Sequence, residues 1–326
     1  MFNVFFFEVF QEEAEALRSF LPADIQAGFT DKTIQQSGML GPPAELISIR
    51  TQSVIPEAWA SRIKGILARS TGYDHLQAYC QDTGIQIPCG YLPLYCAQSV
   101  AEQAMLLWMA LLRKLPLQIR QFSNFHRDGL TGQECGGKYL LVAGVGNIGH
   151  EVARIGKGLG MSVHGIDIVQ RHKNIDYVSL EAGLAEANIV VCAMNLTAEN
   201  RGYFRYHVLQ LCQPGLIFIN IARGELAPTA DLVRLLDEGY LSAVGLDVYE
   251  HENQVAVALR SGLQPMDAET GAVLALAQRA NVILTPHNAF NTREAVRRKS
   301  EQSISQVRAF LDNSVFRWPV PVATEQ

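Results

Sequence analysis

The chain has little of the positive charge, the long apolar segments and the paired cysteines that mark several protein classes. Its 27 Lys and Arg residues are outnumbered by 32 Asp and Glu, and the net charge of −5 argues against binding of nucleic acid or anionic lipid. The most apolar helical stretch, 104–112, is too short to cross a bilayer and is followed by Arg113 and Lys114. The six cysteines show no CxxC pair and no His-rich spacing, so we expect reduced thiols, a cytoplasmic protein and no metal site.

Size and composition predict a globular protein of two domains. The 326 residues are 48% hydrophobic and 18% charged, which is enough for two separate cores. The apolar N-terminal stretch lacks a basic n-region and is interrupted by Glu8. It therefore predicts a first β-strand rather than a signal peptide.

Short apolar runs alternate with helical patterns along the whole chain. This alternation predicts an α/β fold with two Rossmann-like or flavodoxin-like domains, each built on a parallel, doubly wound sheet. A long amphipathic helix is expected from Ser99 to Leu115, ended by Pro116. The expected strands are 3–7, 46–49, 65–68, 139–143, 162–166, 189–193, 216–220, 243–247 and 282–285, and the other expected helices are 12–20, 56–63, 231–238 and 292–311.

A glycine-rich turn between a strand and a helix is the strongest local signal. Gly144 allows the tight turn, Gly146 allows the backbone to approach a pyrophosphate, and Gly149 allows the helix to pack close to the strand. Asn147 and Ile148 lie between the last two glycines, at the start of the helix, whose N-terminus stabilises phosphate charge. The segment predicts a dinucleotide-binding site.

An acidic residue ends the next apolar run. Asp167 is placed to accept hydrogen bonds from the adenosine ribose hydroxyls, and its charge disfavours a 2′-phosphate. NAD is therefore the expected cofactor, although Arg171 and Lys173 follow closely and could attract that phosphate.

The position of this turn in the middle of the chain has a consequence for the domains. We expect a cofactor domain over 99–288 and a discontinuous substrate domain formed by 1–98 and 289–326. The active site is then expected in the cleft between them, at the carboxyl ends of the strands.

Two residues directly after predicted strands suit the chemistry of a hydroxy or keto acid. The planar guanidinium of Arg223 can pair with a carboxylate through two hydrogen bonds, and His287 can exchange a proton near neutral pH. A carboxylate bonded to the imidazole would fix its tautomer and favour its protonated form. Spacing leaves three candidates open in this region, Glu250, His251 and Glu252.

The order of these motifs resembles the D-isomer-specific 2-hydroxyacid dehydrogenase family. The glycine loop with Asp167, the segments ARGE, DVYEHE and TPHNAF, and the upstream RSTGYD and VAEQA carry the resemblance over nearly the whole chain. It implies a catalytic set of Arg223, Glu252 and His287, and so selects Glu252 over Glu250. It also implies substrate contacts from the backbone of Thr71 and Gly72, and cofactor contacts at Ala222 and Asp247.

Within the family the chain is most similar to the fermentative D-lactate dehydrogenases. Three features carry this similarity: Tyr95, which matches a tyrosine near the substrate in that branch, the long helical insertion between Glu252 and Val282, and Phe290 with Thr292. It implies reversible reduction of a pyruvate-like 2-keto acid with NADH, and a homodimer in which the helix from Ser99 to Leu115 contacts the second subunit. The apolar stripe of this helix could equally form interdomain core. The alternatives are a relative acting on glyoxylate, hydroxypyruvate or phosphite, and an NADH-sensing regulatory protein.

Overall fold

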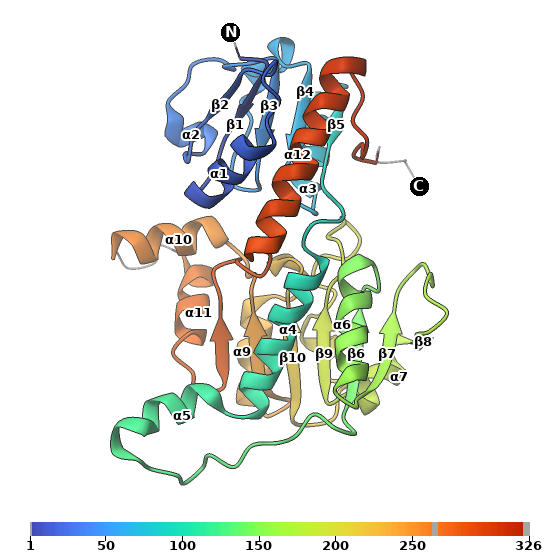
Figure 1. The fold of residues 1–326 in the computed structure, drawn as a ribbon. Coiled ribbons are helices and arrows are strands. Elements are labelled where there is room, and N and C mark those ends of the chain that lie inside the picture. Colours follow the sequence, from blue (N-terminus) through green and yellow to red (C-terminus); the bar gives the residue numbers. More distant parts are fainter. Residues whose placement is uncertain (1, 263–266, 322–326) are drawn as a thin grey trace. The chain divides into compact units, whose positions relative to one another are not determined.

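The computed structural model of the protein describes residues 2–262 and 267–321 (Figure 1). The chain divides into two compact units, one formed by Met1–Cys96 and Asn291–Gln326 and the other by Ala97–Phe290. Each unit contains one parallel β-sheet, so the predicted α/β class with two doubly wound sheets is confirmed. The predicted roles of the two units stay predictions.

The first unit is built on a five-stranded sheet in the order β2-β1-β3-β4-β5. This order is that of the flavodoxin-like doubly wound fold, in which ligands bind outside the carboxyl ends of the strands. The strands are β1 Val4–Phe6, β2 Ala27–Phe29, β3 Leu46–Ile49, β4 Gly65–Ala68 and β5 Cys89–Gly90.

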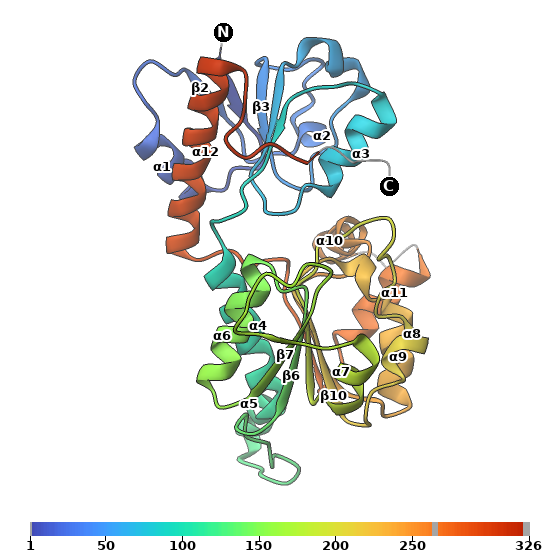
Figure 2. The ribbon, with the colours of Figure 1, turned by 90° about the vertical axis from the view of Figure 1, so that its right-hand side faces the viewer.

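Segments from both ends of the chain complete the first unit. Helix α12, at the C-terminal end, packs along α1, near the N-terminus (Figure 1). These two helices cover one face of the sheet, and α3 lies on the other face (Figure 2). The helices are α1 Gln11–Phe20, α2 Ile34–Ser37, the 3₁₀ helix η1 Glu57–Arg62, α3 Asp74–Thr83 and α12 Arg293–Asn313.

The second unit is built on a seven-stranded parallel sheet in the order β12-β11-β10-β9-β6-β7-β8. The order reverses between β6 and β9, which is the switch point where Rossmann folds bind dinucleotides. The strands are β6 Tyr139–Ala143, β7 Ser162–Ile166, β8 Asp176–Tyr177, β9 Ile189–Cys192, β10 Leu216–Asn220, β11 Leu241–Leu246 and β12 Val282–Leu284.

Helices cover both faces of this second sheet. Helices α4 and α6 lie on one face, and α7, α8, α9 and α11 lie on the other (Figure 2). The central strands β9 and β10 are buried along their whole length, which explains their uninterrupted apolar runs. The helices are α4 Ala97–Leu112, α5 Leu115–Gln121, η2 Phe122–Asn124, α6 Asn147–Gly158, α7 Leu180–Glu186, α8 Tyr206–Leu209, η3 Gly224–Leu226, α9 Thr229–Asp237, α10 Glu252–Ser261 and α11 Ala268–Leu276.

The helix predicted from Ser99 to Leu115 differs in its bounds. Helix α4 begins at Ala97 and ends at Leu112, and Lys114 then takes a left-handed conformation (φ 53°) before α5. Pro116 lies in the first turn of α5, where its missing N–H costs no helical hydrogen bond. The prediction that Pro116 ends the long helix is therefore wrong. The apolar stripe of α4 packs on α6, β10 and β11 of its own unit.

The segment 56–63, predicted as a helix, forms the 3₁₀ helix η1 over Glu57–Arg62. Short helical segments commonly take this tighter turn. None of the helices in the described part of the chain is both long enough and apolar enough to span a membrane.

Candidate active site

The glycine-rich turn joins β6 to α6, as the sequence predicts. Gly144 has φ +86°, and a Cβ there would lie 2.7 Å from the Met194 backbone. A Cβ on Gly149 would lie 1.9 Å from the carbonyl oxygen of Gly144. A Cβ on Gly146, in contrast, would meet nothing within 4 Å. The turn is thus closed on its protein side and open at Gly146, which fits a pyrophosphate approaching the N-terminus of α6.

Asp167 follows β7 and lies beside this turn. One carboxylate oxygen accepts a hydrogen bond from the backbone N–H of Val145 at 2.6 Å, and the other accepts from Val169 at 2.9 Å. In the structure Asp167 therefore ties the end of β7 to the glycine turn. Its contact with a ribose stays a prediction.

His287 and Glu252 form a hydrogen-bonded pair. The Nδ1 atom of His287 lies 2.9 Å from Oε2 of Glu252, and both side chains are partly exposed. Because Nδ1 is engaged by the carboxylate, Nε2 is the nitrogen that can exchange a proton with a ligand. This is the geometry expected of a general acid whose tautomer is set by a neighbouring acid.

The backbone at His287 is in a conformation that side chains rarely adopt. Its φ of +48° lies in the left-handed region, and its N–H donates to the carbonyl oxygens of Asp247 and Thr285. Such a conformation persists only where the surrounding contacts impose it, and it is frequent at functional sites.

Asp247 supplies most of those contacts. Its side chain is 1% exposed and accepts hydrogen bonds from the Thr285 hydroxyl at 2.5 Å and from the N–H groups of Asn288 and Ala289 at 2.9 Å each. Burial raises the pKa of this carboxyl, and these hydrogen bonds oppose that rise. Asp247 thus fixes the loop that carries His287, while its predicted contact with the cofactor stays a prediction.

Glu250 and His251, the two other candidates in this region, are not paired with His287 by the hydrogen bonds described below. Glu250 accepts a hydrogen bond from the N–H of Thr229 at 2.9 Å and so caps the first turn of α9. His251 is exposed and precedes α10 with φ +57°. The structure therefore pairs His287 with Glu252, the residue selected by the family resemblance.

Arg223 lies in the turn after β10. Asn220 shapes this turn, because its side chain accepts from the N–H of Ala222 at 3.0 Å and donates to the carbonyl of Arg223 at 2.8 Å. The Arg223 guanidinium donates to the Ala222 carbonyl at 2.9 Å. Gly224 packs closely against the segment that follows β11. A Cβ on Gly224 would lie 2.0 Å from the backbone of Tyr249.

Arg223, Glu252 and His287 thus come from segments that follow β10, β11 and β12. These three strands are neighbours in the parallel sheet, so their carboxyl ends meet at one edge. The sequence predicted Arg223 and His287 after these strands, and the family resemblance selected Glu252; their catalytic roles stay predictions. The sequence missed Asn220 and Thr285, whose only signal is a polar side chain at or just after the end of a strand.

Thr71, Gly72 and Tyr95 belong to the first unit, after β4 and β5. The Thr71 hydroxyl lies 3.2 Å from the sulfur of Cys96, and the Gly72 carbonyl accepts from Ser70 at 2.6 Å. Tyr95 is buried, which raises the pKa of its phenol, and its carbonyl accepts from Arg298 at 2.9 Å. Their predicted contacts with substrate stay predictions.

No cluster of three or more metal-ligating side chains occurs within residues 2–262 and 267–321. The segments that follow the neighbouring strands β10, β11 and β12 carry an arginine, a carboxylate and a histidine. This set suits binding of an anion and transfer of a proton.

Comparison with known proteins shows the family of the chain. The model of the D-isomer specific 2-hydroxyacid dehydrogenase NAD-binding domain matches residues 105–289. The chain is 33% identical to a D-lactate dehydrogenase of Streptococcus agalactiae over 251 residues, 74% of each chain. It is 29% identical to an aromatic 2-oxoacid reductase of Clostridium sporogenes over 255 residues, 76% of each chain.

A solved structure extends the similarity to nearly the whole chain. The D-lactate dehydrogenase from Aquifex aeolicus, complexed with NAD and lactic acid, has a TM-score of 0.82 and 30% identity, covering 95% of this chain and 96% of that one. The expected cofactor, NAD, and the similarity to the D-lactate dehydrogenase branch are thereby confirmed. The chain belongs to the D-isomer specific 2-hydroxyacid dehydrogenase family and is an NAD-dependent oxidoreductase acting on a CH–OH group.

Proposed function

We propose that this enzyme reduces a pyruvate-like 2-keto acid to the D-2-hydroxy acid, with Arg223, Glu252 and His287 as its catalytic residues. The observation that carries the proposal is the His287–Glu252 hydrogen bond of 2.9 Å, on a loop fixed by Asp247 and at the same sheet edge as Arg223. The names of the relatives, a D-lactate dehydrogenase and an aromatic 2-oxoacid reductase, support a 2-keto acid.

Each residue has a role that follows from its chemistry. The Arg223 guanidinium binds the substrate carboxylate through two hydrogen bonds and polarises the keto group. His287 donates a proton from Nε2 to the keto oxygen, and Glu252 stabilises the protonated imidazole before that transfer. NADH, when bound at the turn of Gly144, Gly146 and Gly149, supplies the hydride.

The first unit supplies the remaining substrate contacts in this proposal. The backbone of Thr71 and Gly72 binds the carboxylate, and Tyr95 lies near the substrate. The unit of Met1–Cys96 and Asn291–Gln326 is then the substrate domain, and Ala97–Phe290 is the cofactor domain. In the second, Asn147, Ile148, Asp167, Ala222 and Asp247 join the glycines in holding NAD.

We further propose that the enzyme is a cytoplasmic homodimer. The predicted contact helix, α4, packs mainly within its own unit, but the neighbouring α5–η2 segment exposes several large apolar side chains. These are Leu115, Ile119, Phe122 and Phe125, with exposures from 41% to 76%. Large apolar side chains exposed along one segment support a subunit contact.

The test is steady-state kinetics with two variants and a matched control. His287→Ala should lower kcat by about 10²-fold or more, because the proton donor is lost, while NADH binding measured by fluorescence stays unchanged. Glu252→Gln should lower kcat less. His251→Ala removes a neighbouring exposed histidine and should leave turnover near that of the wild type.

The substrate is tested with pyruvate, phenylpyruvate, 2-ketobutyrate, oxaloacetate, glyoxylate and hydroxypyruvate, each with NADH and NADPH. Oxidation of phosphite with NAD is assayed beside them, and chiral chromatography identifies the product. Unchanged turnover of His287→Ala would remove His287 from the mechanism. Failure of every keto acid and of phosphite, with tight NADH binding, would favour a regulatory NADH sensor instead.

A further inference from the structure

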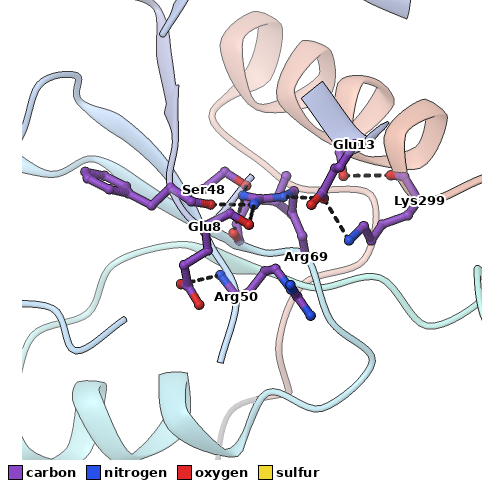
Figure 3. Close-up of polar contacts among 9 residues, drawn as sticks. Glu8, Glu13, Ser48, Arg50, Arg69 and Lys299 are labelled. Atoms are coloured by element: carbon purple, nitrogen blue, oxygen red, sulfur yellow. Dashed lines mark hydrogen bonds and ion pairs between the residues drawn. The ribbon is translucent and has the colours of Figure 1, made fainter. Parts of the chain in front are cut away.

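The carboxyl edge of the first sheet carries a group of charged side chains that the mechanism above does not use (Figure 3). We call Glu8, Glu13, Arg50, Arg69 and Lys299 the edge cluster. Arg50 is the first residue after β3, and Arg69 is the first residue after the adjacent β4. Glu13 comes from α1 and Lys299 from α12, at opposite ends of the chain.

Three members of the edge cluster form a buried ion triad. Oε1 of Glu13 lies 3.0 Å from Nε of Arg69 and 2.8 Å from Nζ of Lys299, and all three side chains are fully buried. Arg69 also donates to the Ser48 hydroxyl at 3.0 Å. With Lys299 protonated, the triad places two positive charges against one negative charge at this edge.

Arg50 is the partly exposed member of the edge cluster. Its backbone N–H donates to Glu8 at 3.0 Å, and the same carboxylate accepts from Gln52 at 3.1 Å and Ser53 at 3.2 Å. These bonds fix the turn from which the guanidinium projects. The guanidinium lies 5.9 Å from the centre of the Phe10 ring, and Nζ of Lys299 lies 5.2 Å from the same ring.

The charge of Arg50 acts on two buried groups of the first unit, Lys299 and Tyr95. Burial, together with the neighbouring charges of Arg50 and Arg69, lowers the pKa of Lys299 to about 7, although Glu13 opposes this shift. The charge of Arg50 also acts on the buried phenol of Tyr95. Arg50 therefore shares one electrostatic environment with a residue proposed to lie near the substrate.

We propose that Arg50 binds a second carboxylate on the substrate. The inference rests on the proposed function, in which Thr71 and Gly72, just beyond Arg69, bind the first carboxylate. Ligands of doubly wound folds bind outside the carboxyl ends of the strands, and Arg50 and Thr71 follow adjacent strands at that edge. The favoured substrate class is then a dicarboxylic 2-keto acid rather than a 2-keto acid with an apolar side chain.

The test compares pairs of substrates and one matched pair of variants. The wild type should reduce oxaloacetate or 2-ketoglutarate with a kcat/KM at least about tenfold above that for pyruvate and 2-ketobutyrate. Arg50→Gln should remove most of that preference by raising KM for the dicarboxylic acids, with pyruvate reduction little changed. Arg62→Gln, at an exposed arginine of the same unit, should leave the preference intact.

The outcomes separate this inference from the proposed function. A wild type that prefers pyruvate to both dicarboxylic acids would overturn the inference alone. So would an Arg50→Gln variant that loses activity equally on all substrates. Absence of turnover with every 2-keto acid would overturn the proposed function and this inference with it. Arg50→Lys, which keeps the charge but not the planar fork, should retain part of the preference.

A second inference comes independently from two cysteines of the first unit. The sulfurs of Cys80, in α3, and Cys89, at the start of β5, lie 3.8 Å apart. Cys80 is partly exposed and Cys89 is buried. The hydrogen bond from the Cys89 thiol lowers the pKa of Cys80 to about 7, so much of Cys80 is the nucleophilic thiolate at neutral pH.

We infer that Cys80 is a site of oxidation by hydroperoxides and that Cys89 resolves the oxidised form into a disulfide. The Cys80 thiolate attacks a peroxide oxygen, the O–O bond breaks, and the departing oxygen takes up a proton to leave as water. The Cys89 thiol then loses its proton and attacks the sulfenic acid of Cys80, which releases a second water. Two thiols are oxidised to one disulfide as one hydrogen peroxide is reduced to two waters.

Hydrogen peroxide, differential alkylation and mass spectrometry test this inference. The wild type should form a Cys80–Cys89 disulfide that dithiothreitol reverses. Cys89→Ser should stop at a sulfenic acid on Cys80 that dimedone traps, and Cys80→Ser should leave Cys89 reduced. Cys135→Ser, at a buried cysteine of the other unit, should behave as the wild type. Oxidation of Cys80 no faster than that of Cys135 would refute the inference.

Discussion

At the scale of single residues, the site depends on which carboxylate meets His287. Glu250 and Glu252 are two positions apart in one turn, and spacing cannot tell which of them faces the histidine. Glu250 is engaged by the N–H of Thr229, whereas Glu252 lies 2.9 Å from the imidazole. The direction of each side chain follows from where α9 and α10 begin, which is a property of the folded chain.

The role of Arg223 can be tested through the shape of its side chain. Arg223→Lys keeps the positive charge but loses the planar fork that binds a carboxylate through two hydrogen bonds. We expect KM for the keto acid to rise by about tenfold or more, since a charge-assisted hydrogen bond contributes about 1.5–3 kcal/mol. Steady-state kinetics measure the change, and the affinity for NADH should be unaltered. A wild-type KM in the variant would argue against carboxylate binding by Arg223.

At the scale of elements, the turn between β6 and α6 contains one glycine needed for packing of the helix and one needed for binding of the ligand. Gly149 must lack a side chain so that α6 can approach β6, whereas the space at Gly146 is open. The sequence pattern predicts the same turn for both glycines. Only the packing in the folded protein distinguishes Gly149, which the fold requires, from Gly146, which the ligand requires.

Two alanine substitutions separate these requirements. Gly149→Ala would place a Cβ 1.9 Å from the Gly144 carbonyl oxygen, so it should lower the free energy of unfolding by about 1–3 kcal/mol. Gly146→Ala should change stability far less but should weaken NADH binding, because the added methyl group occupies the path of the pyrophosphate. Urea denaturation and fluorescence titration with NADH measure the two effects. Equal loss of stability in both variants would contradict this division.

At the scale of the whole molecule, the buried triad joins distant parts of the chain. Glu13 in α1 binds Arg69, which follows β4, and Lys299 in α12 (Figure 3). The triad therefore connects the N-terminal segment to the C-terminal helix that completes the first unit. A buried charge network of this kind is costly to break, because removal of one member leaves the others uncompensated.

Glu13→Gln should lower the free energy of unfolding by about 3–5 kcal/mol. Adding Lys299→Met should restore part of this loss, because one of the two uncompensated cations is then gone. Urea denaturation of the single and double variants measures both changes. A double variant as unstable as the sum of the two singles would contradict the coupling.

The pKa of the Glu13 carboxyl predicts how the free energy of unfolding depends on pH. Burial alone would raise the pKa of Glu13, but the charges of Arg69 and Lys299 outweigh burial and lower it from 4.5 to about 2. A group whose pKa is lower in the folded state stabilises the fold above its unfolded pKa. The contribution should be full above about pH 4.5 and should disappear as the pH falls toward 2. Unfolding midpoints across this range should decline less steeply in Glu13→Gln.

Assembly is also tested at this scale. Phe122→Glu places a charge in the exposed apolar segment of α5 and η2 and should shift the protein from dimer to monomer in sedimentation velocity. Leu40→Glu, at a fully exposed leucine of the first unit, is the matched control and should leave the sedimentation coefficient unchanged. A wild type that sediments as a monomer would contradict the proposed homodimer.

The sequence by itself determined the α/β class, the glycine turn and the positions of Arg223 and His287. These are local properties: apolar runs mark buried parallel strands, and polar residues that follow them lie at the carboxyl edge. It missed β2, β5 and β8, which have two or three residues each and too little periodicity to recognise. Tertiary structure decided the partner of His287, the joining of Glu13 to Lys299 and the approach of Cys80 to Cys89. Each of these contacts depends on how separate elements pack and which way their side chains point, and no local pattern contains that information.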